Sequence, residues 1–420
     1  MKILIDPRGE RNVTYPNVGL AYVSASLKEE HRVIDQYLVP FPEDRYLGYK
    51  TDWLGISVKM TTCKEAMRIS RVYRQRYPGV KVIWGGAHVS CAYDKMSKEN
   101  PEIELFKGEW DYTDDLDCLP FPDYSKFDSF EYLRSAWHKG TLPYPLITSR
   151  GCPYDCLYCA TCLTAGKKWR ARSVENCYQE LLMATQKFHI RSFDILDDTF
   201  NLDKQRVISF CRVIKNLGLR WSCGNGLRAD RFDEDIARAM AAAGCQHVSF
   251  GVESVAPEVL AAIKKGVDIE QIEKAVETAR KYFAVAGFFI IGLPCSDYEK
   301  DLSSLKWAMQ RQIGAHFQYL VPFEGTQLLK DYYPGENFDD ALTFGLGAYP
   351  VSKEYSKALQ ERIYTMTRCM RPESSHMNAV KRNISMGKLI WMFDRKGLVT
   401  RPVHRLIRCV RRAITTGGDN

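Results

Sequence analysis

Three cysteines in one short segment carry the most informative chemistry of this sequence. Cys152, Cys156 and Cys159 stand in the run Ser149-Arg-Gly-Cys-Pro-Tyr-Asp-Cys-Leu-Tyr-Cys159, so their spacing is C-x3-C-x2-C. Three thiolates on one loop can hold three irons of a [4Fe-4S] cluster and leave the fourth iron open to another ligand. A structural zinc site would usually take a fourth protein ligand, so the spacing favours an iron-sulfur cluster.

Alternating strands and helices must position this segment. In the first third of the chain, short apolar strands are expected at 2–6, 31–35, 53–58, 80–86 and 103–106. Helical spacing lies between them, over 18–28 and 64–77. This alternation predicts a doubly wound parallel sheet, which binds ligands at the carboxyl ends of its strands.

A second set of strands begins just before the cysteines. Six are expected, at 145–148, 192–196, 220–223, 246–250, 286–291 and 316–320. Six strand-helix units predict a partial TIM-type barrel with its chemistry at the carboxyl ends of the strands. The later strands end in polar or glycine-rich loops, at 197–200, 225–228, 253–254, 292–294 and 322–326. Any one loop could be an ordinary turn, but the whole series favours a ligand site.

The cysteine spacing, the Ser-Arg-Gly-Cys-Pro lead-in and Tyr158 resemble the radical S-adenosylmethionine (radical SAM) enzymes. The resemblance implies that the open iron binds the amino and carboxylate groups of SAM. One electron from the cluster then cleaves SAM to methionine and a 5′-deoxyadenosyl radical, which removes a hydrogen atom from substrate. By this resemblance the SAM-binding residues are Asp197, Asp198 and Thr199 for the amino group, Glu253 and Ser254 for the ribose, and Tyr158 and Gln318 beside adenine.

The first domain resembles the cobalamin-binding domain of a large radical SAM subfamily. The resemblance rests on the segments 17–22, 31–35, 54–57, 85–88 and 108–109. It implies cobalamin contacts at Ser57, Thr61, Thr62, Gly85, Gly86, His88 and Glu109. The segment after Glu109 is shortened, and no D-x-H-x-x-G supplies a histidine to cobalt. A Rossmann-like domain that has lost its cofactor is therefore the alternative.

The expected architecture is α/β with four parts. Residues 1–115 form a shortened Rossmann-like, cobalamin-binding type of sheet, and residues 116–143 form a linker. Residues 144–334 form the partial (β/α)6 radical SAM barrel, and residues 335–420 form a helical C-terminal region with a basic tail.

Two further cysteines lie near the expected site. Cys162 as a fourth cluster ligand would block the iron that SAM needs, so it is interpreted as a bystander. Cys295 follows Gly292-Leu-Pro294, where relatives more often carry glycine. It is a candidate catalytic residue, as hydrogen-atom donor or covalent anchor, and the alternative is a small residue that fits the turn.

Charge and composition restrict the partners. The net charge is +8, and residues 375–420, with ten Lys or Arg and two Asp, account for all of it. The rest of the chain is close to neutral, which argues against specific binding of nucleic acid. The tail could contact an anionic membrane surface or an acidic carrier. Fourteen cysteines and a first segment, Lys2–Asp6, that predicts a strand rather than a secretory signal favour a reducing cytoplasm.

The resulting functional expectation is cobalamin-dependent C-methylation of an unactivated carbon. As the resemblance implies, one SAM methylates cobalamin, a second yields the radical, and the substrate radical takes the methyl group. The substrate is a small molecule, lipid or peptide, and the electron donor a protein such as flavodoxin or ferredoxin. The alternatives are a radical SAM enzyme without functional cobalamin that performs rearrangement, cyclisation or dehydrogenation, and a non-catalytic cobalamin or iron-sulfur sensor.

Overall fold

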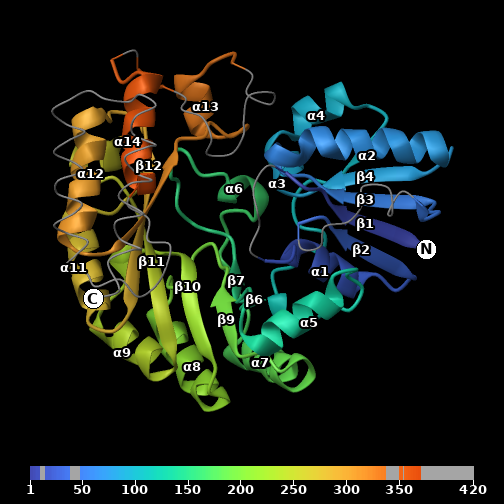
Figure 1. The fold of residues 1–420 in the computed structure, drawn as a ribbon, viewed down its shortest axis with the longest axis horizontal. Coiled ribbons are helices and arrows are strands. Elements are labelled where there is room, and N and C mark those ends of the chain that lie inside the picture. Colours follow the sequence, from blue (N-terminus) through green and yellow to red (C-terminus); the bar gives the residue numbers. More distant parts are fainter. Residues whose placement is uncertain (10–14, 38–47, 337–349, 353, 370–420) are drawn as a thin grey trace, which may run out of the picture.

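The computed structural model describes residues 1–9, 15–37, 48–336, 350–352 and 354–369. An N-terminal sheet and a larger curved sheet lie side by side, each with its own helices (Figure 1). Both sheets are parallel, as predicted. The basic part of the C-terminal tail, for which a membrane or carrier contact is predicted, lies outside the described residues.

The N-terminal sheet has five parallel strands in the order β2-β1-β3-β4-β5. Its strands are β1 (Lys2–Asp6), β2 (His31–Asp35), β3 (Trp53–Ser57), β4 (Lys81–Gly85) and β5 (Glu104–Leu105). Its helices are α1 (Val18–Ser26), α2 (Cys63–Arg76), α3 (Ala87–Cys91) and α4 (Tyr93–Glu99). The chain crosses over between β1 and β3, which is the kind of switch point where such sheets bind ligands.

Helices cover both faces of this sheet, with α2, α3 and α4 on one side and α1 on the other (Figure 1). This explains why β1 is apolar without alternation: Ile3, Leu4 and Ile5 are all at most 2% exposed. Between β5 and the next helix, α5 (Phe130–Lys139), the only helical element is the short 3-10 turn Leu116–Cys118. The segment after Glu109 therefore contains no α-helix before α5.

The segment between the two sheets packs on both. Val33 of β2 pairs with Phe127 in a parallel bridge, so the connection extends the N-terminal sheet at its edge. Trp137 of α5 contacts the rings of Tyr144 and Phe188 on the other side, at centroid distances of 5.3 and 5.4 Å. These contacts hold the two halves in one arrangement.

The larger sheet has six parallel strands in the order β13-β12-β11-β10-β9-β6. They are β6 (Tyr144–Leu146), β9 (Ser192–Ile195), β10 (Arg220–Leu227), β11 (Cys245–Glu253), β12 (Ala284–Ile291) and β13 (Gly314–Tyr319). All six predicted strands are present. Two of them, β10 and β11, end later than predicted. A register shift carries the pairing of β10 with β11 past Cys223 to Leu227, and another carries the pairing of β11 with β12 to Glu253.

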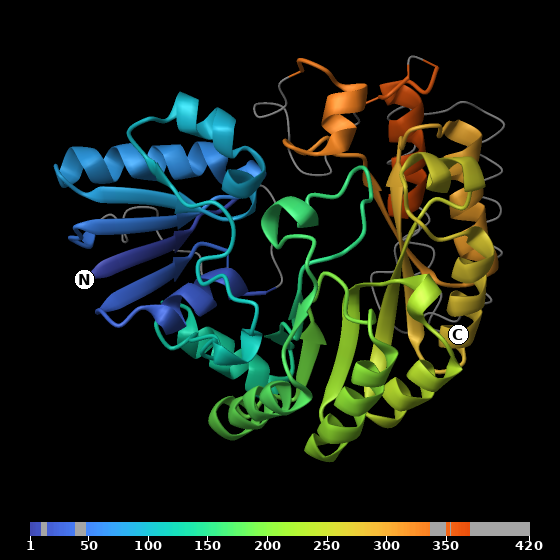
Figure 2. The same cartoon turned by 180° about the vertical axis from the view of Figure 1, so that it is seen from behind.

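The outer helices of the barrel follow the strands in turn. They are α7 (Val174–Phe188), α8 (Lys204–Ile214), α9 (Glu234–Ala242), α10 (Pro257–Ala262), α11 (Ile269–Arg280), α12 (Tyr298–Gln310), α13 (Gln327–Tyr332) and α14 (Lys357–Cys369). Figure 2 shows the curved sheet with these helices from behind. None of the helices in the described ranges is long and apolar enough to cross a membrane.

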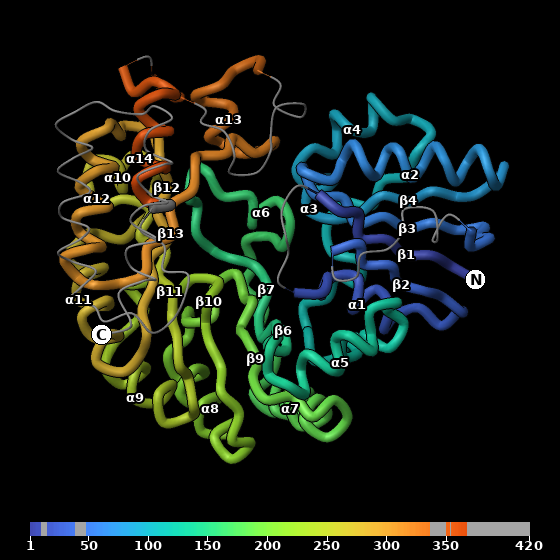
Figure 3. Tube along the Cα trace, viewed as in Figure 1, coloured from blue at the N-terminus to red at the C-terminus, as the bar shows by residue number. Residues whose placement is uncertain are grey.

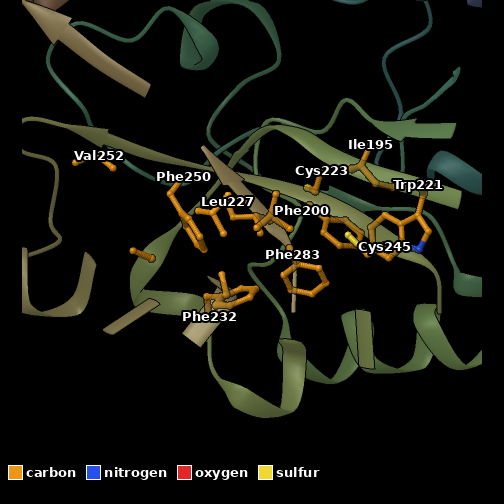
Figure 4. Close-up of a cluster of buried hydrophobic side chains, with 14 of the residues drawn as sticks. Ile195, Phe200, Trp221, Cys223, Leu227, Phe232, Cys245, Phe250, Val252 and Phe283 are labelled. Atoms are coloured by element: carbon orange, nitrogen blue, oxygen red, sulfur yellow. The ribbon is translucent and has the colours of Figure 1, made fainter. Parts of the chain in front are cut away.

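The core of the barrel lies between the sheet and its outer helices. Phe250, Phe232 and Trp221 are among the side chains gathered there (Figure 4). Alternate residues of the strands face the opposite, concave side, where Asp194, Ser222 and Phe288 remain half-buried. The short helix α6 (Thr161–Thr164), which follows the cysteines, lies between the two halves of the molecule (Figure 3).

Candidate functional site

The cysteine loop is closed at its base by two short antiparallel strands. These are β7 (Ser149–Arg150) and β8 (Arg170–Ala171). Gly151 has φ of 86°, and a Cβ there would lie 2.3 Å from the carbonyl oxygen of Lys168, so the closure requires glycine. The loop is also tied to the barrel, since the N–H of Leu157 donates to the carbonyl of Ile263 at 3.0 Å.

The three cysteines of this loop are half-buried and within electrostatic reach of one another. Burial raises the pKa of Cys156 to about 11 and also raises that of Cys159, with smaller contributions from neighbouring thiols. The hydroxyl of Thr199 donates to the sulfur of Cys152 at 3.2 Å. In the described ranges, no three His, Cys, Asp or Glu side chains converge as ligands of a single metal ion.

Asp197 ties the second barrel strand to the start of the cysteine loop. Its carboxylate accepts hydrogen bonds from the N–H of Thr148 and from the hydroxyls of Thr148 and Ser149, each at 2.6 Å. Burial raises the pKa of this carboxyl, and the three hydrogen bonds oppose the rise. The backbone carbonyl of Asp197 accepts from Asn225 at 2.9 Å. The Asp197 side chain is therefore occupied by the loop's own support.

The next two residues also contact the cysteine loop. Asp198 accepts a hydrogen bond from the N–H of Gly151 at 3.0 Å, and burial raises the pKa of its carboxyl. The carbonyl of Thr199 accepts from the indole N–H of Trp169 at 3.1 Å. The predicted segment 197–199 thus lies against the cysteines, as its order along the barrel required.

Glu253 forms a buried ion pair at the end of β11. Its carboxylate lies 2.8 Å from the ammonium of Lys265, and both side chains are 9% exposed. Burial by itself lowers the pKa of Lys265, but the charges of Glu253 and Cys156 raise it overall. Burial and the charge of Glu253 raise the pKa of Tyr158 well above its usual value. Tyr158, Cys156 and Lys265 therefore belong to one cluster around Glu253.

Lys265 has no signal in the sequence that would have identified it. It follows α10 and carries no recognisable motif. Of the remaining predicted SAM residues, Ser254 is fully buried and its hydroxyl accepts the N–H of Ala256 at 3.2 Å. Gln318 lies on β13 opposite Ile290 of β12 and is half-buried.

A cavity of about 340 Å³ lies between the two halves of the molecule. Its N-terminal wall includes the predicted residues Ser57, Gly85, Gly86 and Glu109. Its barrel wall includes Ile147, Ser149, Arg150, Leu196 and Asp198. The cavity thus lies between two parts of the molecule. On one side is the carboxyl edge of the N-terminal sheet, at its β1/β3 switch point, and on the other is the barrel rim that carries the cysteine loop.

The other residues predicted to contact cobalamin lie outside the cavity wall. Thr62 is fully buried and its hydroxyl accepts the N–H of Lys59 at 2.9 Å. His88 is 4% exposed within α3, and Thr61 lies beside Gly9. Asn17, which begins the segment 17–22 that carries the resemblance, lines the cavity, as do Phe106 and Trp110, which no sequence pattern singled out.

One residue of the N-terminal half, Tyr15, contacts the concave face of the barrel. The hydroxyl of Tyr15 donates to one carboxylate oxygen of Asp194 on β9, and the hydroxyl of Ser222 on β10 donates to the other. His247 is the register neighbour of Ser222 on β11, and burial lowers its pKa. Asp194 of this polar row lies two residues before Leu196, which directly follows β9 and lines the cavity.

The two additional cysteines have different surroundings. Cys162 is half-buried on α6, with its sulfur 3.9 Å from the carbonyl oxygen of Cys159. Cys295 is exposed, with φ of 62°, and borders a separate cavity of about 200 Å³ beside Tyr355 and Gln360. No residue of that cavity also lines the larger one.

Two family descriptions match the chain. "Radical SAM superfamily" matches residues 146–307, and "B12 binding domain" matches residues 7–113. An uncharacterised methyltransferase of Pyrococcus horikoshii is 30% identical over 363 residues, which are 75% of this chain and 78% of that protein. The chain therefore belongs to the radical SAM superfamily, in the group that carries a B12-binding domain ahead of the radical SAM domain.

Further similarities agree with this placement. The cytidylyl-2-hydroxyethylphosphonate methyltransferase of Streptomyces wedmorensis is 30% identical over 250 residues, covering 56% of this chain and 47% of that protein. The structure of the radical SAM methyltransferase TsrM from Kitasatospora setae with cobalamin and a [4Fe-4S] cluster has a TM-score of 0.64 at 18% identity. That alignment covers 87% of this chain and 85% of TsrM, and it shows a shared fold.

The family's cofactors fit the residues present. A [4Fe-4S] cluster and SAM follow from the radical SAM match, and cobalamin follows from the B12-binding match. The thiols of Cys152, Cys156 and Cys159 share one closed loop, which suits a cluster bound through three cysteines. The glycine-lined cavity lies at the switch point of the N-terminal sheet, which is where sheets of this kind bind ligands, so it fits a cofactor of that domain.

Proposed function

We propose that this enzyme methylates an unactivated carbon of a small-molecule substrate. The observation that carries the proposal is the cavity whose two walls come from the two sheets. Ser57 and Gly86 on one wall belong to the half that matches the B12-binding domain. Ser149 and Asp198 on the other wall adjoin the cysteine loop. A methyl donor and a radical source held on these walls would face one space.

When bound, the cluster and SAM supply a carbon radical, and cobalamin supplies the methyl group. The residues of the chain hold and shield these groups. We propose Cys152, Cys156 and Cys159 as cluster ligands. We assign SAM binding to the predicted set Tyr158, Asp197, Asp198, Thr199, Glu253, Ser254 and Gln318, with Asp197 acting through its backbone, because its carboxylate already accepts three hydrogen bonds from Thr148 and Ser149.

The Glu253–Lys265 pair and the apolar cavity wall give this site its electrostatic character. A buried carboxylate near Tyr158 suits the hydroxyls and the positive charge of SAM, and the ammonium of Lys265 pairs with that carboxylate at 2.8 Å. Leu4, Ile147 and Leu196 give the space between the walls an apolar lining. A dry enclosure protects a reactive intermediate from side reactions.

We also propose the domain boundaries of the chain and its partners. We place the B12-binding domain at 1–115, the linker at 116–143, the barrel at 144–334 and the C-terminal region at 335–420. A one-electron protein donor of the flavodoxin or ferredoxin type would reduce the cluster. Lipid or peptide substrates, and a membrane or carrier contact of the basic tail, are the further partners to be tested.

Anaerobic reconstitution tests this function. The protein would be purified without oxygen, loaded with iron, sulfide and hydroxocobalamin, desalted, and reduced with dithionite in the presence of SAM. We expect about one corrin per chain in the visible spectrum and formation of 5′-deoxyadenosine. Without retained corrin, the methylation proposal fails, and 5′-deoxyadenosine alone would favour rearrangement, cyclisation or dehydrogenation. Without 5′-deoxyadenosine, a sensor becomes the better interpretation.

A further inference from the structure

Two arginines lie opposite each other at the base of the cysteine loop. Strands β7 and β8 pair Arg150 with Arg170, so two positive side chains stand on one face of the smallest sheet in the described structure. Like charges directly opposite each other destabilise an antiparallel pair. The loop that holds the three cysteines therefore needs a counter-charge in order to stay closed.

Glu109 of the N-terminal half supplies that charge. One of its carboxylate oxygens lies 2.7 Å from a guanidinium nitrogen of Arg150, and the other accepts a hydrogen bond from Arg170. The side chains of Glu109 and Arg150 are 12% and 14% exposed, and that of Arg170 is 1% exposed. A second nitrogen of Arg170 donates to the carbonyl of Thr113 at 2.7 Å. One carboxylate thus binds both ends of the loop.

The turn that places Glu109 is built from the wall of the large cavity. Gly108 has φ of 86°, and its N–H donates to the hydroxyl of Ser90 at 3.0 Å. That hydroxyl donates in turn to the carbonyl of Gly86 at 3.1 Å. Gly86, Ser90, Gly108 and Glu109 all line the cavity. A continuous series of contacts therefore leads from the cavity wall to the base of the cysteine loop.

We propose that Glu109 is a positioning residue, a latch that keeps the cysteine loop closed and fixes it against the B12-binding domain. Both of its oxygens are engaged by arginines, so its main partner is the loop rather than the corrin. The latch itself depends only on the ion pairs. Its consequence for methyl transfer, through the spacing of the two cofactors, rests on the proposed function.

An exposed ion pair between the same two segments provides a matched control. Asp114 lies 2.7 Å from Lys168, and their side chains are 63% and 62% exposed. Such exposed pairs contribute little, because water and salt screen them. Removing Glu109, whose side chain is 12% exposed, instead leaves two facing arginines without the one anion that binds both, which is far more costly.

Hydrogen exchange on the full-length protein, reconstituted with its cluster and without cobalamin, tests the latch. The variants are Glu109→Ala, Asp114→Asn, Arg170→Met and the double variant of Glu109→Ala with Arg170→Met. We expect Glu109→Ala to speed exchange in residues 149–171 roughly a hundredfold, and Asp114→Asn to change it less than about threefold. The double variant should exchange more slowly than Glu109→Ala, because the opposed charges are gone.

A spectroscopic readout separates positioning from simple stability. The variants are compared at equal cluster content by the electron paramagnetic resonance signal of the reduced cluster, which changes when SAM binds. Glu109→Ala should require at least about tenfold more SAM for this change than Asp114→Asn. Unchanged loop exchange in Glu109→Ala overturns the latch, as does a double variant that is no better than the single. If Glu109→Ala does not fold, rescue by Arg170→Met supports the latch and absence of rescue contradicts it. Failure of the wild type to retain cobalamin would overturn the proposed function without affecting these results.

Discussion

The two edges that border the large cavity are built in different ways. On the barrel edge, Asp198 lines the cavity, and the acidic side chains that do not reach it are buried and matched: Asp197 accepts three hydrogen bonds, and Glu253 pairs with Lys265. On the N-terminal edge, the wall is small and mostly apolar, with Gly85 and Gly86 beside Leu4 and Ile83. Each edge therefore presents a different surface to a ligand.

The difference corresponds to the two ligands that the family uses. SAM is a small cation with an amino acid end, and it is held by charges and carbonyls at fixed positions. A corrin is broad and needs open space beside a surface without protruding side chains. Substitutions on the barrel edge should therefore impair ligand binding by disturbing charge pairing. Substitutions on the N-terminal edge should impair it by changing the shape of the wall.

The largest effect is expected from the cysteines. Cys156→Ala should abolish both cluster assembly and 5′-deoxyadenosine formation, because two thiolates cannot hold the cluster with one open iron. Iron and sulfide content and product chromatography measure the two outcomes. Cys162→Ala is the matched control, since Cys162 lies on the adjoining helix α6, and it should retain both. If Cys156→Ala still cleaves SAM, the assignment of the SAM site to the barrel edge is contradicted.

The next effect concerns the buried ion pair. Glu253→Gln leaves the ammonium of Lys265 buried without its anion, so the free energy of unfolding should fall by about 3 kcal/mol. 5′-Deoxyadenosine formation should fall with it. Urea denaturation measures the stability. As a control, Glu104→Ala breaks the exposed Lys81–Glu104 pair and should change stability by less than about 1 kcal/mol. Equal effects of the two changes would contradict the assigned electrostatics.

On the N-terminal edge, the shape of the cavity wall should determine whether hydroxocobalamin is retained. Gly86 has φ of 99°, and a Cβ there would lie 2.9 Å from the carbonyl oxygen of Val58. Gly86→Ala should weaken retention of hydroxocobalamin about tenfold, since a shift of this wall costs roughly 1–2 kcal/mol. Gly79→Ala is the control, because Gly79 has φ of 94° and open space around it. Both variants should lose stability, but only the first should lose corrin.

Asp35 predicts a pH dependence in the N-terminal half. Burial, and then the charge of Asp6, raise its pKa from 3.8 to about 7. The folded state thus favours the protonated form, so this contribution to stability is full below about pH 4 and is lost as pH rises towards 7. In Asp35→Asn the unfolding free energy should fall less steeply between pH 5 and 7. Equal slopes in urea titrations across that range would refute the assignment.

The smallest effect is expected at Cys295. It is exposed and holds φ of 62°, a conformation that costs a non-glycine residue roughly 1 kcal/mol. Cys295→Gly should therefore raise the melting temperature slightly and leave 5′-deoxyadenosine formation unchanged. The predicted role as hydrogen-atom donor or anchor would show itself separately, as loss of methylated product with normal SAM cleavage.

The sequence predicted the parts of the site that depend on local order. The cysteine loop follows the first barrel strand, and the polar residues follow the later strands, because period-two and strand-helix patterns are local signals. Side-chain partners were a different matter. Arg170 meets Glu109 across 61 positions, and Tyr15 meets Asp194 across 179. No local pattern encodes such pairs, since they arise only when the two sheets come together.

The full length of β10 and β11 could not be predicted from the sequence either. Glycines at 224 and 226 interrupt the strand pattern, and the register shifts that carry the pairing on to Leu227 depend on the neighbouring strand. Likewise, Asp197 was expected beside SAM and it follows the second barrel strand as predicted, but its carboxylate supports Thr148 and Ser149. Position along the barrel could be predicted, whereas side-chain direction could not.

One experiment tests most directly whether the two edges serve one site. The enzyme would be reconstituted anaerobically with its cluster, with and without hydroxocobalamin, and given SAM and dithionite. Both 5′-deoxyadenosine and S-adenosylhomocysteine should form, and only the second should require added hydroxocobalamin. If S-adenosylhomocysteine never forms, or forms equally without the corrin, the N-terminal edge does not serve methyl transfer and the account is wrong.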